Sequence, residues 1–179
     1  MSASDVTSRA LRGLSVAAPR SGSGKTLLTL GLLASFIRRG HTVQAYKAGP
    51  DFIDPGHHAA LTGRPSQNLD GWMLGKAACE DIFGRAARRS IQGRAPDLLL
   101  LEGVMGLFDG YDGRTEDGST AQMAKWLGLP VLLVVDARSM ARSLAALVLG
   151  FETFDPDLVL AGVLANNVGS HRHLEYLIQ

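Results

Sequence analysis

The sequence Ser21-Gly-Ser-Gly-Lys-Thr26 follows a short apolar run at 14–18 and precedes a long amphipathic stretch. This order indicates a strand, a glycine-rich turn and a helix. In such a turn, successive backbone N–H groups point into one concavity at the helix N-terminus, where the helix dipole adds partial positive charge. Gly22 and Gly24 let the backbone curl closely around an anion because neither has a Cβ. The stretch therefore predicts a phosphate-binding loop.

The side chains at the end of this turn suggest a nucleoside triphosphate as the ligand. Lys25 can reach the β- and γ-phosphates, and the Thr26 hydroxyl can ligate Mg²⁺. The usual pattern has a glycine five positions before Gly24, where this chain has Pro19, which lacks an N–H to donate. We expect the loop to enter differently from the common version. The residues predicted to bind ATP from this stretch are Ser21, Gly22, Ser23, Gly24, Lys25 and Thr26.

Apolar runs of strand length alternate with helical patterns along the rest of the chain. The expected strands are 14–18, 42–47, 98–101, 130–135 and 158–165, and the expected helices are 27–39, 72–89, 120–127, 142–149 and one that begins at 171. Residues 48–70 are rich in Gly, Pro and Asp and are expected to form a loop. Continuously apolar strands separated by helices predict an α/β fold in which a parallel sheet has helices on both faces.

Composition narrows the class of protein. The chain has 179 residues, of which 46% are hydrophobic and 20% charged, as in one soluble globular domain. A net charge of +1 gives no electrostatic case for nucleic acid as a partner, and no apolar stretch is long enough for a membrane span. Residues 1–13 are polar, lack a signal-peptide core and are expected to be disordered or extended. With a single cysteine, Cys79, these features predict a cytoplasmic protein.

Charged residues follow two of the expected strands, at the sheet edge where parallel sheets bind ligands. Asp51 and Asp54 are three residues apart and follow Lys47, which suits a site that holds Mg²⁺ and positions a phosphoryl acceptor. Taken alone, this stretch is better explained as a polar turn, but its place at a strand end favours the site. Glu102 ends an otherwise aliphatic strand and is a candidate magnesium ligand.

Asparagine and aspartate end two later strands. Asn166 is placed to hydrogen-bond an adenine edge, with Asn167 as its competitor, and an Asn tolerated in a turn is an equally good explanation. Asp136 either serves the site or caps the helix that follows.

The histidine and cysteine residues do not indicate a metal site or a nucleophile. The side chains of His57 and His58 should diverge, so we do not expect them to share a metal. Cys79 lies in a helical pattern without an adjacent histidine and is expected to be a small buried apolar residue.

Several blocks of the sequence resemble one known family. They are Pro-Arg-Ser-Gly-Ser-Gly-Lys-Thr (19–26), Lys-Ala-Gly-Pro-Asp-Phe-Ile-Asp-Pro-Gly-His-His (47–58), Thr-Gly-Arg-Pro-Ser-Gln-Asn-Leu-Asp (62–70) and Glu-Gly-Val-Met-Gly-Leu-Phe-Asp-Gly (102–110), with shorter ones at 118–121, 135–138 and 167–173. They are similar to the cobyrinate/hydrogenobyrinate a,c-diamide synthases of vitamin B12 biosynthesis. In that family Pro19 is normal, whereas Asn167 departs from it because relatives often carry Arg there.

The resemblance implies a P-loop NTPase fold of the dethiobiotin-synthetase-like type and an ATP-dependent, magnesium-requiring amidoligase. In such enzymes ATP phosphorylates the a and c carboxylates of a corrin ring, and ammonia then displaces the phosphate. A C-terminal domain produces that ammonia by hydrolysing glutamine. The resemblance thus implies that 14–179 is an amidoligase domain truncated at its C-terminal end, that the glutaminase domain is absent from this chain, and that the protein is a homodimer.

The family also suggests a role for each candidate residue. Lys25 and Thr26 would hold the phosphates and Mg²⁺, and Asp51 and Glu102 would complete the metal site. Lys47 would steady the transferring phosphoryl group. The catalytic set is therefore Lys25, Lys47 and Asp51, the metal set is Thr26, Asp51 and Glu102, and Asn166 would face adenine.

Three other functions share this fold. A partition- or septum-type ATPase switch would carry a lysine in place of Arg20 and would not need the 47–58 block. Dethiobiotin synthetase would activate a small diamine, and the 62–70 block argues against it. A nickel-sirohydrochlorin a,c-diamide synthase cannot be separated from the corrinoid enzymes by sequence.

Overall fold

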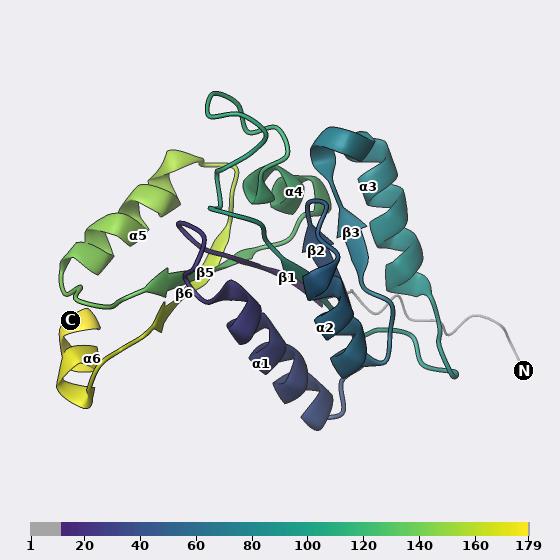
Figure 1. Cartoon of the computed structure of the whole chain (residues 1–179), viewed down its shortest axis with the longest axis horizontal. Coiled ribbons are helices and arrows are strands. Elements are labelled where there is room, and N and C mark those ends of the chain that lie inside the picture. The colour runs from purple at the N-terminus through teal and green to yellow at the C-terminus, as the bar shows by residue number, and fades with distance from the viewer. Residues whose placement is uncertain (1–11, 179) are drawn as a thin grey trace, which may run out of the picture.

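The computed structural model describes residues 12–178 of the chain. Its strands are β1 (Arg12–Ala17), β2 (Val43–Ala48), β3 (Gln67–Leu69), β4 (Leu98–Glu102), β5 (Val131–Asp136) and β6 (Leu160–Asn166). Its helices are α1 (Lys25–Arg38), α2 (Ile53–Thr62), α3 (Gly71–Arg88), α4 (Thr120–Leu127), α5 (Ser143–Phe154) and α6 (His171–Leu177). Within this range the strands form one sheet in the order β3-β2-β4-β1-β5-β6, and every pairing is parallel (Figure 1). The predicted α/β fold is confirmed.

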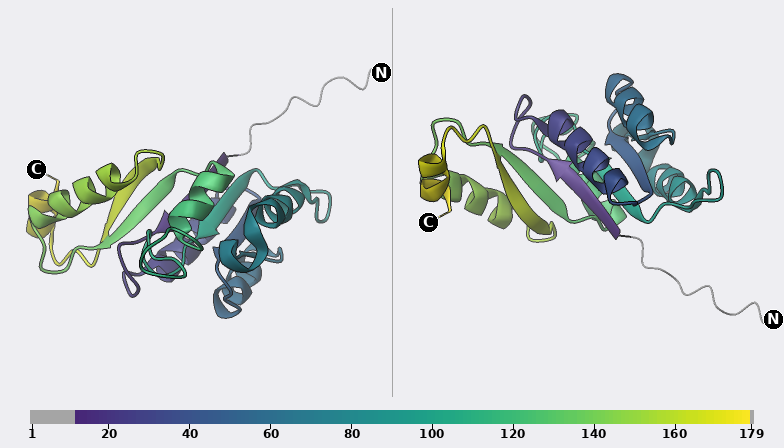
Figure 2. Two further views of the ribbon diagram at one scale, coloured as in Figure 1. Left: turned by 90° about the horizontal axis from the view of Figure 1, so that it is seen from above. Right: turned by 90° about the horizontal axis from the view of Figure 1, so that it is seen from below.

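Helices cover both faces of the sheet, as the apolar strands predict. Along β2, Val43 and Ala45 pack with Leu33 of α1, whereas Tyr46 packs with Cys79 of α3 on the opposite face. This alternation follows from the two-residue period of a strand. Helix α2 lies beside α1, and α4 and α5 lie on the same face as α3. Figure 2 shows α4 in front of the sheet in the view from above and α1 in front of it from below.

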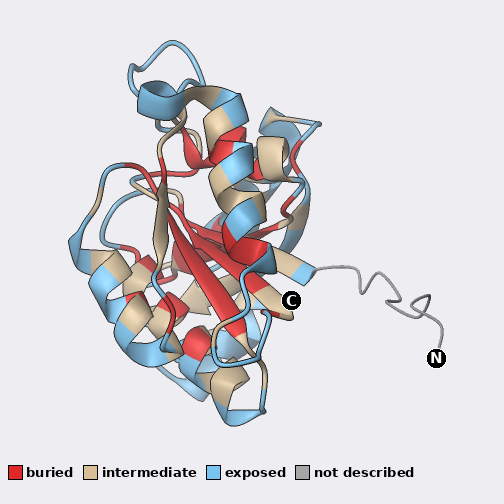
Figure 3. Cartoon of the chain, turned by 90° about the vertical axis from the view of Figure 1, so that its right-hand side faces the viewer, coloured by how far each residue is buried: buried red, intermediate tan, exposed pale blue. Residues whose placement is uncertain are grey.

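Strands β2, β4 and β5 are almost completely buried, and β1 is buried along its second half (Figure 3). A parallel sheet covered on both faces leaves little room for charge, so β2 and β4 are apolar along most of their length. Two charged side chains are exceptions. Lys47 on β2 is 4% exposed and Glu102 on β4 is 0% exposed, and the two residues are register partners at the carboxyl ends of their strands.

The expectation of an irregular loop at 48–70 was wrong. This segment contains helix α2 and the short strand β3, which pairs with 46–48 of β2. The helix forms despite Pro55 because proline is tolerated in the first turn, where its missing N–H has no intrahelical acceptor. Gly63 ends the helix with a left-handed φ of 65°. The Gly, Pro and Asp content that suggested a loop marks the two ends of a helix.

The other elements lie within a few residues of their expected positions. Strand β1 begins at Arg12, whereas residues 1–11 of the expected N-terminal segment lie outside the described residues. Ser119 caps α4, because its hydroxyl accepts a hydrogen bond from the N–H of Gln122 at 3.0 Å. Helix α5 follows Arg142, so Asp136 does not cap it. Among residues 12–178, no helix has both the length and the apolar character that a membrane span requires.

Candidate active site

The phosphate loop connects β1 to α1 and has the backbone geometry that its glycines predict. Gly22 and Gly24 adopt left-handed φ angles of 78° and 97°, a region in which other residues are strained. The Ser23 hydroxyl donates to the carbonyl of Arg20 at 3.0 Å, which closes the loop from within. At the end of the edge strand β6, the Asn166 side-chain amide donates to the Ser23 carbonyl at 3.0 Å. The loop is therefore held in shape on both sides.

Lys25 lies folded into this loop. Its ammonium donates to the carbonyl of Met105 at 2.5 Å and to that of Arg20 at 3.4 Å. Burial, and after it the positive charge of Lys47, lower the pKa of Lys25 below its usual value. Met105 lies in the loop that follows β4, has a left-handed φ of 49° and is 54% exposed. The phosphate-loop lysine thus ties its own loop to the loop that follows β4.

A cavity of about 390 Å³ opens over the phosphate loop. Its lining combines the residues that sequence analysis selected with the start of the loop after β4: Ser21, Gly22, Gly24, Lys25, Thr26, Leu27, Lys47, Asp51, Gly103, Val104 and Met105. A larger cavity of about 530 Å³, lined by the loop at 108–116 and the end of α5, borders it and shares Met105. Most of the predicted ATP residues therefore line one cavity with Lys47 and Asp51, at the carboxyl ends of the strands, where parallel sheets bind ligands. Ser23, Asn166 and Glu102 are not among its lining residues.

The Lys47 side chain lies at the floor of this cavity. Its ammonium lies 2.5 Å from Asp54 Oδ2 and 3.1 Å from Glu102 Oε1, and donates to the carbonyl of Gly103 at 3.2 Å. Burial alone would lower the pKa of Lys47, but the hydrogen bonds and charges of the two carboxylates outweigh it and raise that pKa. Lys47 is therefore a fixed cation.

Glu102 is surrounded by donors. Its Oε1 accepts a hydrogen bond from the Thr26 hydroxyl at 2.6 Å as well as from Lys47, and its Oε2 lies 2.7 Å from His58 Nε2. Burial would raise the pKa of the carboxyl, but the bonds from His58 and Thr26 and the charge of Lys47 lower it to about 2. Glu102 is therefore a carboxylate at any physiological pH.

Asp54 lies nearer than Asp51 to the Lys47 ammonium and also approaches the Thr26 hydroxyl. Asp54 Oδ2 is 3.4 Å from the Thr26 hydroxyl, while the Asp51 carboxylate is 3.8 Å from Lys47 Nζ. Asp51 Oδ1 instead accepts from the N–H groups of Ile53 at 2.8 Å and Asp54 at 3.3 Å, so it caps the first turn of α2. Sequence analysis noticed Asp54 but did not include it among the site residues.

The oxygen atoms at this point fit a magnesium ion. Within residues 12–178 no group of three or more His, Cys, Asp or Glu side chains forms a metal cluster. Mg²⁺ needs no such cluster, since it is commonly held by one or two carboxylates together with phosphate oxygens and waters. The Thr26 hydroxyl and the Glu102 carboxylate are 2.6 Å apart beside the phosphate loop, which is the hard-oxygen donor set that this ion prefers.

His58 is the residue that sequence analysis missed. We considered it only as a metal ligand together with His57, and rejected it because adjacent side chains diverge. Once 53–62 is known to be a helix, His58 lies four residues after Asp54 and so on the same face. That spacing, beside Lys47 and before a buried glutamate, is the pattern that would have found it.

The polar groups at the ends of β5 and β6 bond to one another. Asn167, with a left-handed φ of 58°, donates from its side chain to Asp136 at 2.9 Å. The Asp136 carboxylate also accepts from the N–H of Arg138 at 3.1 Å and lies 3.8 Å from Arg20 of the phosphate loop. Asp136 therefore supports the loop that follows β5, and Asn166 rather than Asn167 contacts the phosphate loop.

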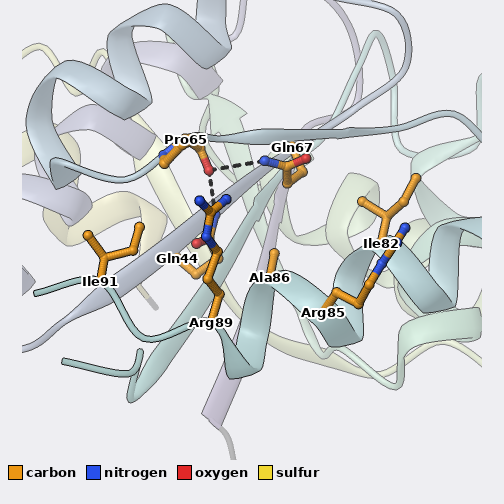
Figure 4. A pocket seen from close by; sticks show the side chains of 8 residues that line it. All are labelled: Gln44, Pro65, Gln67, Ile82, Arg85, Ala86, Arg89 and Ile91. Carbon is orange, nitrogen blue, oxygen red and sulfur yellow. Dashed lines mark hydrogen bonds between the residues drawn. The ribbon is translucent and has the colours of Figure 1, made fainter. Parts of the chain in front are cut away.

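Two other features are structural. Cys79 is fully buried, and burial raises the pKa of its thiol, so the expectation of a small apolar residue is confirmed. A cavity of about 310 Å³ between α3 and the start of β2 is lined by Gln44 and two arginines among others (Figure 4). The Gln44 amide already bonds to carbonyls, and Arg85 pairs with Asp81 at 2.9 Å. This cavity lies at the opposite end of β2 from Lys47, away from the phosphate loop.

Comparison with known families supports this geometry. A family model described as the CobQ/CobB/MinD/ParA nucleotide binding domain matches residues 14–179. The chain belongs to this family. The family is described as nucleotide-binding, which agrees with the glycine-rich loop at 19–26.

The curated relatives compared with the chain are named either cobyrinate or hydrogenobyrinate a,c-diamide synthase. The chain is 54% identical over 164 residues to a cobyrinate a,c-diamide synthase of Syntrophotalea carbinolica, covering 92% of this chain and 34% of the relative. It is 49% identical over 173 residues to a hydrogenobyrinate a,c-diamide synthase of Streptomyces coelicolor, covering 97% of this chain and 34% of that protein. The chain therefore spans about a third of the length of these relatives, and the similarity identified from its motifs is confirmed.

Solved structures match at the level of fold. Chloroplast FtsY from Physcomitrella patens superposes with a TM-score of 0.52 at 22% identity, covering 86% of this chain and 48% of that one. At this identity the match shows a shared fold and nothing about the ligand.

Proposed function

We propose that this chain is the ATP-binding amidoligase domain of a corrinoid a,c-diamide synthase, which activates the a and c side-chain carboxylates of cobyrinate or hydrogenobyrinate. The observation that carries the proposal is the Lys47 ammonium, buried against Asp54 and Glu102 on the floor of the same cavity as Lys25. A plain nucleotide switch has no need for a second buried cation beside its phosphate loop. The names of the curated relatives support the substrate.

The reaction proceeds in two steps. An oxygen of the substrate carboxylate attacks the γ-phosphorus of ATP, the bond to the ADP oxygen breaks, and an acyl phosphate forms. Ammonia then attacks the acyl carbon, phosphate leaves, and the nitrogen loses a proton to give the amide. The first step brings one anion to another, so it depends on positioning and charge neutralisation more than on a protein nucleophile.

The chain's residues supply both. Lys25 binds the β- and γ-phosphates from within the loop, and Lys47 neutralises the phosphoryl group as it transfers to the carboxylate. Thr26 and Glu102, with Asp51 or Asp54, would hold Mg²⁺, which when bound supplies Lewis-acid neutralisation of the phosphate oxygens. Asn166, whose amide contacts the Ser23 carbonyl, is proposed to face the adenine ring. The first turn of α2, capped by Asp51, keeps Asp54 aimed at Lys47.

Other parts of the activity lie beyond this chain. Because the chain spans about a third of its relatives' length, we place the glutamine-hydrolysing domain that supplies ammonia in the remaining two-thirds. We also propose a cytoplasmic homodimer, as the family resemblance implies.

Mass spectrometry of the corrinoids tests the proposal. The chain is incubated with ATP, Mg²⁺ and excess ammonium, which replaces the glutaminase, and with cobyrinate, hydrogenobyrinate or nickel-sirohydrochlorin. We expect ATP-dependent replacement of one or two carboxyl hydroxyls by amino groups in one of the first two. Amidation of nickel-sirohydrochlorin alone would move the assignment to that synthase. Nucleotide binding with all three macrocycles unchanged, together with nucleotide-dependent dimerisation in light scattering, would favour the partition-type switch.

A further inference from the structure

His58 is the one residue of α2 that is completely buried. An imidazole in such a place is usually either packed as an apolar ring or bonded at both nitrogens. Here both ring nitrogens have partners. Nε2 lies 2.7 Å from Glu102 Oε2, and Nδ1 lies 3.2 Å from the Ser66 hydroxyl. The Ser66 hydroxyl oxygen also lies 3.2 Å from the carbonyl oxygen of Ala45. The ring is therefore fixed between the sheet backbone and the Glu102 carboxylate.

The two oxygens of Glu102 are divided between different partners. Oε2 faces His58, whereas Oε1 faces the Thr26 hydroxyl at 2.6 Å and the Lys47 ammonium at 3.1 Å. Because a carboxylate rotates about one bond, holding Oε2 also fixes the direction of Oε1. The contact between His58 and Oε2 thus fixes the orientation in which the Glu102 carboxylate faces the phosphate loop.

Helix α2 connects this contact to the rest of the site. Asp54, at the start of the helix, bonds Lys47 at 2.5 Å, and His58 follows one turn later on the same face. Lys47 and Glu102 are register partners on β2 and β4. One helical face therefore orients both charged residues of the strand ends, one through each side chain.

From this geometry we propose that His58 is a positioning residue for the magnesium–nucleotide site. It holds Glu102 so that Oε1 is directed at the Thr26 hydroxyl, the pair of oxygens that would hold Mg²⁺, without itself touching the nucleotide. Ser66 positions His58 in turn. The inference rests on the proposed function, because it takes Thr26 and Glu102 as the metal side of an ATP site. Partners of this kind behind a metal-binding side chain contribute about 10- to 100-fold to metal affinity.

Two substitutions separate positioning from packing. The amide nitrogen of Gln reaches approximately the place of Nε2, and that of Asn approximately the place of Nδ1. His58→Gln therefore keeps a donor to Glu102 and His58→Asn removes it, while both replace the ring by an amide. The matched control is His57→Gln, which changes the exposed neighbouring histidine on the same helix.

The measurement is ADP affinity by calorimetry, once with excess Mg²⁺ and once with EDTA, and thermal stability is recorded for each variant. We expect wild type, His57→Gln and His58→Gln to gain affinity with Mg²⁺, and His58→Asn to lose roughly tenfold or more of that gain while its EDTA value stays close to wild type. Equal effects of Gln and Asn, or parallel shifts with and without Mg²⁺, would make the role of His58 purely structural and overturn the proposal.

The outcome for wild type separates this inference from the function on which it rests. If wild-type protein gains no affinity with Mg²⁺, the proposed function itself fails. If His58→Asn does not fold, Ser66→Ala provides the same test, because it loosens the ring and leaves it in place. A Ser66→Ala protein with the full wild-type gain would then count against His58 as a positioning residue.

Discussion

The Lys47 ammonium lies 2.5 Å from Oδ2 of Asp54, and this ion pair joins the end of a buried strand to the first turn of the following helix. Lys47 is 5% exposed at its side chain and Asp54 is 16% exposed, so water screens the pair little. The second carboxylate on the same ammonium, that of Glu102, is 0% exposed. The strand end therefore holds one cation that compensates two largely buried anions, with the more exposed Asp51 carboxylate 3.8 Å away.

Removing the Lys47 ammonium should lower the stability of the folded protein. We expect Lys47→Ala to lower the free energy of unfolding by about 3–5 kcal/mol, because two largely buried carboxylates lose their compensating charge. Urea denaturation monitored by fluorescence measures it. The control is Lys76→Ala, since the exposed Lys76–Glu80 pair at 3.8 Å should contribute about 0–1 kcal/mol. Equal losses in the two variants would contradict the compensating role of Lys47.

Lys25 should matter for nucleotide rather than for stability. Its ammonium donates to the backbone carbonyls of Met105 and Arg20, and the buried Glu102 carboxylate keeps its bond to Lys47 when Lys25 is removed. We expect Lys25→Ala to weaken binding of Mg·ADP by roughly 10- to 100-fold, which corresponds to about 1.5–3 kcal/mol for a charge-assisted hydrogen bond. Calorimetric titration of both proteins measures it. Near-wild-type affinity would remove the phosphate-loop assignment.

Two glycines near the loop should respond in opposite ways to alanine. Gly24 has a φ of 97°, and an added Cβ would come within 2.4 Å of the Asn166 amide, so Gly24→Ala should disrupt the loop and nucleotide binding. Gly31 lies in α1, where an added Cβ meets nothing within 4 Å. Gly31→Ala should raise stability by about 0.5–1 kcal/mol, because alanine favours the helix. Thermal melts and ADP titrations distinguish the two; a Gly24→Ala protein that binds normally would show that the loop tolerates a side chain.

Glu102 should make stability depend on acid pH. Its pKa in the folded protein is about 2, below the 4.5 of an unfolded chain, so its contribution is fully present above about pH 4.5 and is lost as the pH falls toward 2. Glu102→Gln should therefore show a shallower loss of unfolding free energy across this window than wild type does. Glu80→Gln, a change at an exposed ion pair, should keep the wild-type slope. Identical slopes in all three proteins would place the acid sensitivity elsewhere.

Periodicity was sufficient to predict most of the sheet because β2, β4 and β5 are buried on both faces and carry unbroken apolar runs. It failed at 48–70 for a reason of local chemistry. Pro55 and Gly56 suggest a turn wherever they occur, and only the capping of the first turn by Asp51 shows that a helix begins there. Strand β3 has three residues, which is too short for any alternation to be visible.

The parts of the candidate site that are contiguous in the sequence were easier to predict than those that depend on contacts between distant residues. The loop at 21–26 is contiguous in sequence, and its pattern identified Lys25 and Thr26 directly. Lys47 and Glu102 were found because each ends a strand with a charge. His58 was not, because its role depends on a contact with Glu102 that is 44 residues distant along the chain. Residue roles at the metal, and the adenine contact of Asn166, remain predictions.

If the proposed function holds, the bond between Lys25 and the Met105 carbonyl links the nucleotide cavity thermodynamically to the larger cavity beside it. Met105 lines both the nucleotide cavity and the larger neighbouring one, and the ammonium it accepts from is the same one that phosphate needs. A ligand that moves this loop must therefore change nucleotide affinity, and by reciprocity nucleotide must change the affinity of that ligand by the same factor.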